Sequence, residues 1–466
     1  MARTERKNTG MIRDLTEGSI PKLLLSFTLP LLLSNALQAV YNIVDMIVVG
    51  QVLGGTGMSA VSIGGEVLHF LTFLSIGFSN AGQILIARLV GEKREDDIRK
   101  MIGTIFTFLF VVAAAVSVLC IVFRHGILTV LNTPKESYPD ALDYVTTCAA
   151  GLVFIYGYNI VSAILRGMGD SRRPFLFISI AAVLNIVLDV LFVAYLGMGV
   201  FGAALATVLG QGTSFLFSIV FLYRRRDAFH FDFRPESFRM DPASRTALLR
   251  LGIPMAIQSA SVNFSKMLVT SWINSYGVIN SAVAGIFNKL STVINVVGAA
   301  FNATGGAMMS QNLGARRYDR VKGILGWVLL FGASISSVFS LILVLFPTQV
   351  FELFTRDSAV LLAAPVIILP CVVNFFGTAV RTMGFAMVNG SGNSRLNLLV
   401  ALTDGIIARI GISALLGFAA GLGCLGFWLG DALAGYLPFL IGTGYYLSRR
   451  WMKQEPVIDG KEEKDG

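Results

Sequence analysis

Four polar residues that could bind a cation lie inside long apolar segments of this sequence. They are Asp45, Asn185, Asp189 and Thr207. Asn185 and Asp189 are four residues apart, so a helix would place both on one face. Counted inward from the outer ends of their segments at about 1.5 Å per residue, Asp45, Asp189 and Thr207 reach one depth, roughly 12 Å below the outer surface. Because polar groups are costly at membrane depth, this convergence favours a functional site over separate helix-pairing contacts.

The side chains of this group offer carboxylate, amide and hydroxyl oxygens. Hard cations are bound by oxygen ligands, and Na+ is one of them. Two carboxylates held close together in a low dielectric repel each other, which favours uptake of a proton near neutral pH. The sequence therefore predicts a cation-coupling site for Na+, for H+ or for both, and no other cofactor.

Glu66 and His69 form a second candidate group. Their i, i+3 spacing can bring the two side chains together on one helix, and Glu66 lies at about the same depth as the first group. Two interpretations stay open. The residues form a structural hydrogen-bonded pair, or they form a proton relay, since His changes its charge near neutral pH.

The segments that must position these residues are membrane helices. The chain has 466 residues, of which 55% are hydrophobic and only 14% charged, whereas soluble domains average about 25% charged residues. A membrane span needs about 20 residues of helix, and continuous apolar runs exclude the alternating pattern of a barrel. Twelve such runs occur, at 20–51, 58–87, 99–123, 139–165, 174–196, 200–223, 246–275, 279–309, 321–346, 358–388, 396–419 and 425–448.

The distribution of basic residues predicts the topology. Of the 37 Lys and Arg residues, 30 fall in segments on one side of the membrane, three on the other, and four within helices. This asymmetry follows the positive-inside rule and places both termini in the cytoplasm of a plasma (inner) membrane protein. It also explains the net charge of +9 without nucleic acid as a partner.

The second half of the chain repeats the first at an offset of 222 to 224 residues. Leu29-Pro30 matches Ile253-Pro254, and the turn at 166–172 matches the one at 389–395. Because six helices per half is an even number, both halves enter from the same side, which predicts a parallel repeat. We expect a cytoplasmic tail (1–19), an N-terminal lobe (20–223), a flexible cytoplasmic linker (224–245), a C-terminal lobe (246–448) and a cytoplasmic tail (449–466).

The two halves differ in the charges inside their helices. The second half carries Lys266, Lys289, Arg381 and Arg409 against Asp404 and Asp431. These basic residues either contact anionic groups or pair with the aspartates, and the sequence does not choose between the two. Aromatic residues can line a pocket for flat cationic ligands, although helix packing or an interfacial belt is the commoner reason for them. The candidate substrate-cavity residues are Tyr41, Asn42, Tyr144, Tyr158, Asn159, Lys266 and Lys289.

Several motifs are similar to those of multidrug and toxic compound extrusion (MATE) transporters of bacteria. They are Asp14-Leu-Thr-Glu-Gly-Ser-Ile-Pro-Lys22, Tyr41-Asn-Ile-Val-Asp45, Leu165-Arg-Gly-Met-Gly-Asp170 and Asn185-Ile-Val-Leu-Asp189. The resemblance implies two six-helix bundles around a V-shaped cavity, and export of cationic amphipathic compounds in exchange for Na+ or H+. It further implies a cation site at Asp45, Asn185, Asp189 and Thr207, with Ala203 one turn before the threonine. Lys266 and Arg381 stand where some relatives carry acidic residues, so a second sodium site is not expected.

Other classes of function find less support in the sequence. Gly197-Met-Gly-Val-Phe-Gly202 fits a dinucleotide-binding pattern, but it follows a membrane helix and not a strand, so we expect no nucleotide. An HExxH motif and clustered His or Cys are absent, which argues against an enzyme. We expect a monomeric antiporter for small amphipathic organic compounds. The alternative is a flippase for lipid-linked or other anionic amphiphilic precursors, whose cavity would need to be basic.

Overall fold

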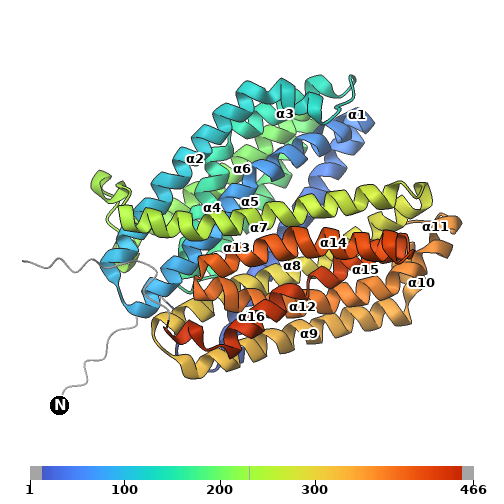
Figure 1. The fold of residues 1–466 in the computed structure, drawn as a ribbon. Coiled ribbons are helices and arrows are strands. Elements are labelled where there is room, and N and C mark those ends of the chain that lie inside the picture. The colour runs from blue at the N-terminus through green and yellow to red at the C-terminus, as the bar shows by residue number, and fades with distance from the viewer. Residues whose placement is uncertain (1–12, 230, 454–466) are drawn as a thin grey trace, which may run out of the picture. The chain divides into compact units, whose positions relative to one another are not determined.

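A computed structural model describes residues 13–229 and 231–453, and these ranges consist of helices and their connections, with no β-strand (Figure 1). The first half contains α1 (Ile20–Glu92), α2 (Glu95–Val130), α3 (Tyr138–Ala150), α4 (Leu152–Gly167), α5 (Arg172–Asp189), η1 (Val190–Tyr195), α6 (Gly199–Arg224), η2 (Arg226–Phe229) and η3 (Pro235–Phe238).

The second half contains α7 (Pro242–Asn274), α8 (Val278–Gly314), η4 (Tyr318–Arg320), α9 (Val321–Leu345), α10 (Pro347–Glu352), α11 (Ser358–Ala363), η5 (Ala364–Ile367), α12 (Ile368–Ser391), α13 (Ser394–Leu402), η6 (Thr403–Ala408), α14 (Arg409–Ala414), η7 (Leu415–Ala419), α15 (Cys424–Ala434), α16 (Leu437–Leu447) and η8 (Arg450–Lys453). Of these short elements, η6 and η7 are π-helical, as is η1 of the first half.

The number of membrane spans agrees with the sequence. In the described ranges nine helices are long and apolar enough to cross a membrane, or ten if α3 and α4, bent by 46°, form one span. Two further spans complete the predicted twelve: α1 contains two helices, and α7 is 33 residues long but less apolar than the others. The prediction of twelve membrane helices is therefore confirmed.

Gly54 divides α1 into its two helices. Its backbone angles are φ 68° and ψ −157°, which only glycine adopts without strain. The sequence predicts a loop at 52–57, but the residues on both sides of Gly54 are helical. One glycine is therefore enough to turn the chain here.

α2 differs more from its prediction, since it ends at Val130 and not at residue 123. Arg124 and His125 interrupt the apolar run but continue the helix. The Arg124 guanidinium donates to the Ile121 carbonyl at 3.0 Å, and His125 Nδ1 lies 2.9 Å from the Tyr138 hydroxyl. Loss of apolar character marks the end of a membrane span, but it does not require the end of a helix.

The described chain divides into two compact units. Unit 1 comprises Leu33–Leu249 with the described residues before Thr16, and unit 2 comprises Thr16–Leu32 with the chain from Arg250 onward. The units follow the expected lobes except at the start of α1, which packs within unit 2. There Thr28 donates a hydrogen bond of 3.0 Å to Thr304 of α8, and Phe27 is fully buried.

The connection between the halves is packed, although the sequence predicts a flexible linker. Phe231 is buried, and its ring lies 6.2 Å from that of Phe106 on α2. The Thr107 hydroxyl donates to the Phe238 carbonyl, and the Asp241 amide donates to Thr104 Oγ1 at 3.1 Å. Phenylalanines between the charges and prolines bury their rings against α2, and this apolar burial outweighs the polar composition.

Candidate cation site

Three side chains of unit 1 combine deep burial with unpaired polar atoms. Asp45 of α1 is 8% exposed, and Asn185 and Asp189 of α5 are 4% and 0% exposed. Within the described residues, no protein group hydrogen-bonds Oδ1 of Asp45, either amide atom of Asn185 or either carboxylate oxygen of Asp189. Because buried polar groups are costly without partners, these atoms are available to bind a cation, a proton or water.

Asp45 and Asp189 are close enough to interact electrostatically. In the part of the chain that the structure describes, neither carboxylate forms an ion pair with Lys, Arg or His. Two buried carboxylates of like charge and without a counter-ion favour binding of protons or of a cation. The structure brings the predicted residues Asp45, Asn185 and Asp189 into one unit as buried, unpaired groups, and their role in ion coupling stays a prediction.

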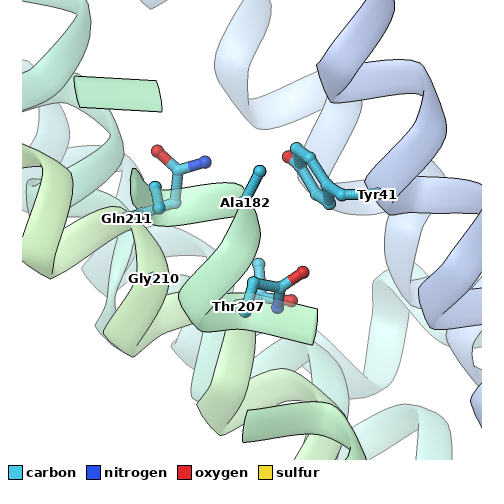
Figure 2. Close-up of a pocket in the computed structure, with 7 residues that line it drawn as sticks. Tyr41, Ala182, Thr207, Gly210 and Gln211 are labelled. Carbon is cyan, nitrogen blue, oxygen red and sulfur yellow. The ribbon is translucent and has the colours of Figure 1, made fainter. Parts of the chain in front are cut away.

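A small pocket lies beside these residues. It is lined by Tyr41, Ala181, Ala182, Asn185, Thr207, Gly210 and Gln211. Figure 2 shows Tyr41 on α1 facing the side chains that α5 and α6 present. A Cβ at Gly210 would lie only 3.2 Å from the Ala181 carbonyl oxygen and from Asn185 Cβ, so this glycine lets α5 and α6 approach closely at Asn185.

Two tyrosines interact both with pocket residues and with Asp45. Tyr144 of α3 lies close enough to Thr207 and to Asp45 to interact with both. Tyr41 lies close enough to Gln211 and to Asp45 to interact with both. A Cβ at Gly64 would lie 2.3 Å from the Tyr144 ring, so Tyr144 occupies the space that this glycine leaves.

Gln211 is a pocket residue that the sequence reasoning missed. It is buried on α6, four residues after Thr207, and both side chains line the pocket. That i, i+4 spacing is the signal that could have identified it, because it repeats the relation between Asn185 and Asp189.

Ala203 lies one turn before Thr207 on the same helix. It is fully buried in the apolar core of unit 1, together with Tyr144, Val193 and Val200. A methyl group cannot ligate a cation, so only the main chain of Ala203 could contribute to the site.

The remaining predicted cavity residues of unit 1 lie in different surroundings. The Tyr158 hydroxyl donates to the Pro174 carbonyl at 3.1 Å, and Asn159 Nδ2 donates to Ser75 Oγ at 3.2 Å. These bonds connect neighbouring helices. Asn42 is exposed, so protein does not cover it.

Glu66 and His69 are both exposed on the second helix of α1. Within the described residues no hydrogen bond or ion pair joins them, and the His69 ring packs edge-on against Phe73 at 4.8 Å. Glu66 also has no interaction with Asp45, Asn185 or Asp189 among those residues. The proton relay at Glu66 and His69 stays a prediction.

Comparison with known proteins decides the family. The family model described as MatE matches residues 30–191 and 254–415, one match in each half. The chain belongs to the MatE family.

Individual relatives agree with this assignment. The chain is 28% identical over 427 residues to the probable multidrug resistance protein YoeA of Bacillus subtilis (strain 168), covering 90% of this chain and 92% of that protein. It is 31% identical over 317 residues to the probable multidrug resistance protein YpnP of the same strain, covering 66% and 68%. A solved structure, described as an outward-facing multidrug resistance MATE family transporter of the MOP superfamily, matches with a TM-score of 0.87 at 22% identity, covering 96% and 99%. This MatE protein is thus a multi-pass membrane transporter of the multidrug efflux type.

Unit 2 of this MatE chain contains a buried ionic triad in place of unpaired acids. Arg409 is 2% exposed and pairs with two aspartates. Its Nη2 lies 3.3 Å from Oδ1 of Asp404, and its Nη1 donates to the Asp431 carboxylate and, at 3.1 Å, to the Asp431 carbonyl. The aspartates are 0% and 7% exposed, so one positive and two negative charges lie together inside the unit, with a net charge of one negative unit.

The repeat relates this triad to the candidate site. Thr207 and Asp431 each lie eight residues after the first glycine of the matching turns at Gly199 and Gly423. Asn185 and Arg409 each lie 14 residues before those glycines, with a π-helical segment between in both halves. Arg409 of unit 2 therefore corresponds in the repeat to Asn185 of unit 1, whose side-chain amide has no hydrogen-bond partner among the described residues.

Lys266 and Lys289, the two predicted cavity lysines of this MatE chain, differ in burial. Lys266 of α7 is half-buried and lies within electrostatic range of the triad, whereas Lys289 of α8 is exposed. The sequence leaves open whether the basic residues contact anionic groups or pair with the aspartates. Arg409 pairs with the aspartates. Lys266 has no direct carboxylate partner among the described residues.

Proposed function

We propose that this MatE protein is a monomeric, Na+- or H+-coupled antiporter that exports amphipathic organic compounds, with cationic drugs or metabolites as the expected class. It acts in the plasma membrane with both termini in the cytoplasm, by alternating access and with no enzymatic step. The observation that carries the proposal is the set of buried, unpaired polar atoms on Asp45, Asn185 and Asp189. A transported ion that enters and leaves this group can supply the missing charge.

Coupling requires that the ion binds the two conformations of the transporter with different affinity. The ion can shift the conformational equilibrium only by that difference, and by linkage it changes substrate affinity by the same factor. Tyr144 lies within interaction range of both Asp45 and the pocket residue Thr207, so it can connect the carboxylates to the pocket. We propose that loading of the carboxylates weakens substrate binding through this connection.

The side chains support either coupling ion. The group offers carboxylate, amide and hydroxyl oxygens, which suit a hard cation. The same pair of carboxylates, without a basic partner in the described residues, also suits proton binding. The coupling ion is therefore identified by measuring which gradient, sodium or proton, drives transport.

The test uses inside-out membrane vesicles or proteoliposomes with rhodamine 123, a cationic dye, added to the outer solution. A sodium or a proton gradient is imposed separately, and dye flux is measured for the wild type, Asp45→Asn and Asp189→Asn. We expect one of the gradients to drive transport in the wild type, and both variants to lose at least about tenfold of that gradient-driven flux. Asp143→Asn on α3, which changes an exposed carboxylate in the same unit, is the matched control and should transport normally. Full gradient-driven transport by both site variants contradicts the proposed site.

A second candidate function is a flippase for lipid-linked or other anionic amphiphilic precursors. Lys266 and Arg381 have no carboxylate partner within 4.0 Å among the described residues. Their positive charge favours this second function, because a flippase for anionic precursors needs a basic cavity. A scrambling assay with a lipid-linked oligosaccharide in proteoliposomes separates the two functions, because an antiporter for free compounds leaves the lipid in its original leaflet.

A further inference from the structure

Two basic side chains of unit 2 lie close to the ionic triad but outside it. Lys266 is on α7 and Arg381 is on α12, and both are half-buried. In the described part of the chain neither forms an ion pair. The guanidinium of Arg381 donates to Asn295 Oδ1 of α8 at 2.7 Å, and this is its one hydrogen bond there. Asn295 fixes the orientation of the guanidinium and leaves its other N–H groups available.

The charges of this region do not balance. Lys266 interacts electrostatically with Asp431, Asp404, Arg409 and Arg381. Both aspartates are already bonded to Arg409. Three cations thus share two carboxylates, and the region has a net charge of about one positive unit.

An uncompensated positive charge within the membrane-spanning part of a protein is costly and usually faces a ligand or a water-filled path. Aspartate or glutamate could have neutralised it locally, but the nearby acids are engaged with Arg409. Arginine recognises carboxylate and phosphate through its planar fork of donors, and lysine adds a point charge beside it. An ammonium and a guanidinium without acidic partners therefore form a suitable receptor for an anion.

We propose that Lys266 and Arg381 form a binding site for a carboxylate or phosphate group of the transported compound. The proposal rests on the proposed export function and narrows its substrate class to amphipathic molecules that carry an anionic group, including zwitterions. Asn295 is a positioning residue in this site, because it acts by holding Arg381.

Rhodamine 110 and its methyl ester rhodamine 123 test the proposal, because they share one ring system and differ in a free carboxylate. Binding of each dye to the purified full-length protein in an uncharged detergent is measured by fluorescence polarisation, without any ion gradient. We expect the wild type to bind the acid about tenfold more tightly than the ester, the scale of one good charge-assisted contact. Lys266→Gln and Arg381→Gln should lose this preference and keep their affinity for the ester.

Two further variants make the result specific. Lys266→Arg keeps the charge and should retain most of the preference for the acid. Lys322→Gln removes an exposed lysine at the start of α9, in the same unit, and should behave as the wild type does. Equal binding of the two dyes by the wild type, including no binding of either, overturns the proposal. A preference that survives in both glutamine variants also overturns it.

The source of the anion is identified by competition. Displacement of rhodamine 110 by phosphatidylglycerol in mixed micelles assigns the site to a lipid headgroup, and displacement by inorganic phosphate assigns it to a free anion. If neither competitor displaces rhodamine 110, the site recognises the anionic group only as part of an organic compound such as the dye. The proposed export function can fail independently: it fails if neither gradient drives dye flux in the wild type, even while the preference for the acid persists.

Discussion

At matching positions of the repeat, Asn185 and Thr207 in unit 1 correspond to Arg409 and Asp431 in unit 2. In unit 1 the buried atoms of Asn185 and the nearby carboxylates have no partner among the described residues. In unit 2 the Arg409 guanidinium bonds two aspartates. The backbone is similar in both, including a π-helical segment after Asn185 and after Arg409. The difference therefore lies in the side chains, since unit 2 carries its own cation, whereas under the proposed function unit 1 binds one from solution.

This comparison shows how a repeated fold can give its two copies different tasks. A buried acid with no counter-ion responds to the concentration of ions around the protein. A buried acid bonded to a fixed arginine does not, because its charge is compensated at all physiological conditions. Unit 1 is thus suited to sensing an ion, and unit 2 to holding a constant structure.

The largest expected effect comes from Arg409→Met. It leaves Asp404 and Asp431 buried without a bonded cation, which should cost about 3–5 kcal/mol of folding free energy. We expect a large fall in the melting temperature of the purified protein, measured by the change in Trp fluorescence. The triple variant Arg409→Met, Asp404→Asn, Asp431→Asn should recover most of the loss. A single variant as stable as the wild type means that the triad contributes little.

A smaller effect on stability is expected in unit 1, where the substitution should not lower the melting temperature. Asp189→Asn removes no ion pair, so without a coupling ion its melting temperature should equal or exceed that of the wild type. The coupling ion at ten times its Kd should stabilise the wild type by about 1.4 kcal/mol. The variant should show no such gain.

Thermal melts in NaCl and in choline chloride of equal ionic strength, each at two pH values, measure this effect. The choline series controls for general screening, and the two pH values separate Na+ from H+. If Asp189→Asn is as unstable as Arg409→Met, the two sites do not differ in the way described.

The smallest effect concerns the tyrosine that supports the ion site. In Gly64→Ala the added Cβ would lie 2.3 Å from the Tyr144 ring and displace it from Thr207. Ion affinity, taken from the same melts, should fall by about threefold, roughly 0.7 kcal/mol. Gly65→Ala is the matched control, because its Cβ meets nothing within 4 Å. Equal affinities in the two variants would show that Tyr144 has no part in ion binding.

The membrane helices could be predicted from the sequence because a bilayer admits only continuous apolar helices or closed barrels. Acidic residues inside such apolar runs are rare, so Asp45 and Asp189 could be identified as candidate site residues from the sequence alone. Depth along a helix gives the height of a residue in the membrane, but rotation decides which neighbours it meets. Glu66 is predicted at the same depth as Asp45, yet it is exposed and has no interaction with Asp45 among the described residues.

Pairings between helices were not predictable in the same way. Arg409 and Asp431 are 22 residues apart on different helices, so their bond depends on how α14 packs against α15. The fit of Tyr144 to Gly64 depends likewise on tertiary packing. The buried linker was missed because its charges and prolines hide four phenylalanines, Phe229, Phe231, Phe233 and Phe238, which form ring contacts with one another and with neighbouring helices.

The covalent attachment of Arg409 also bears on stoichiometry. A cation that is part of a side chain cannot be exchanged across the membrane, so under the proposed function only the carboxylates of unit 1 can deliver ions. Two carboxylates can take one Na+ or up to two protons per cycle. Each net charge that crosses contributes about 2.3 kcal/mol per 100 mV of membrane potential. The charge of the exported compound then decides whether the voltage assists or opposes the cycle.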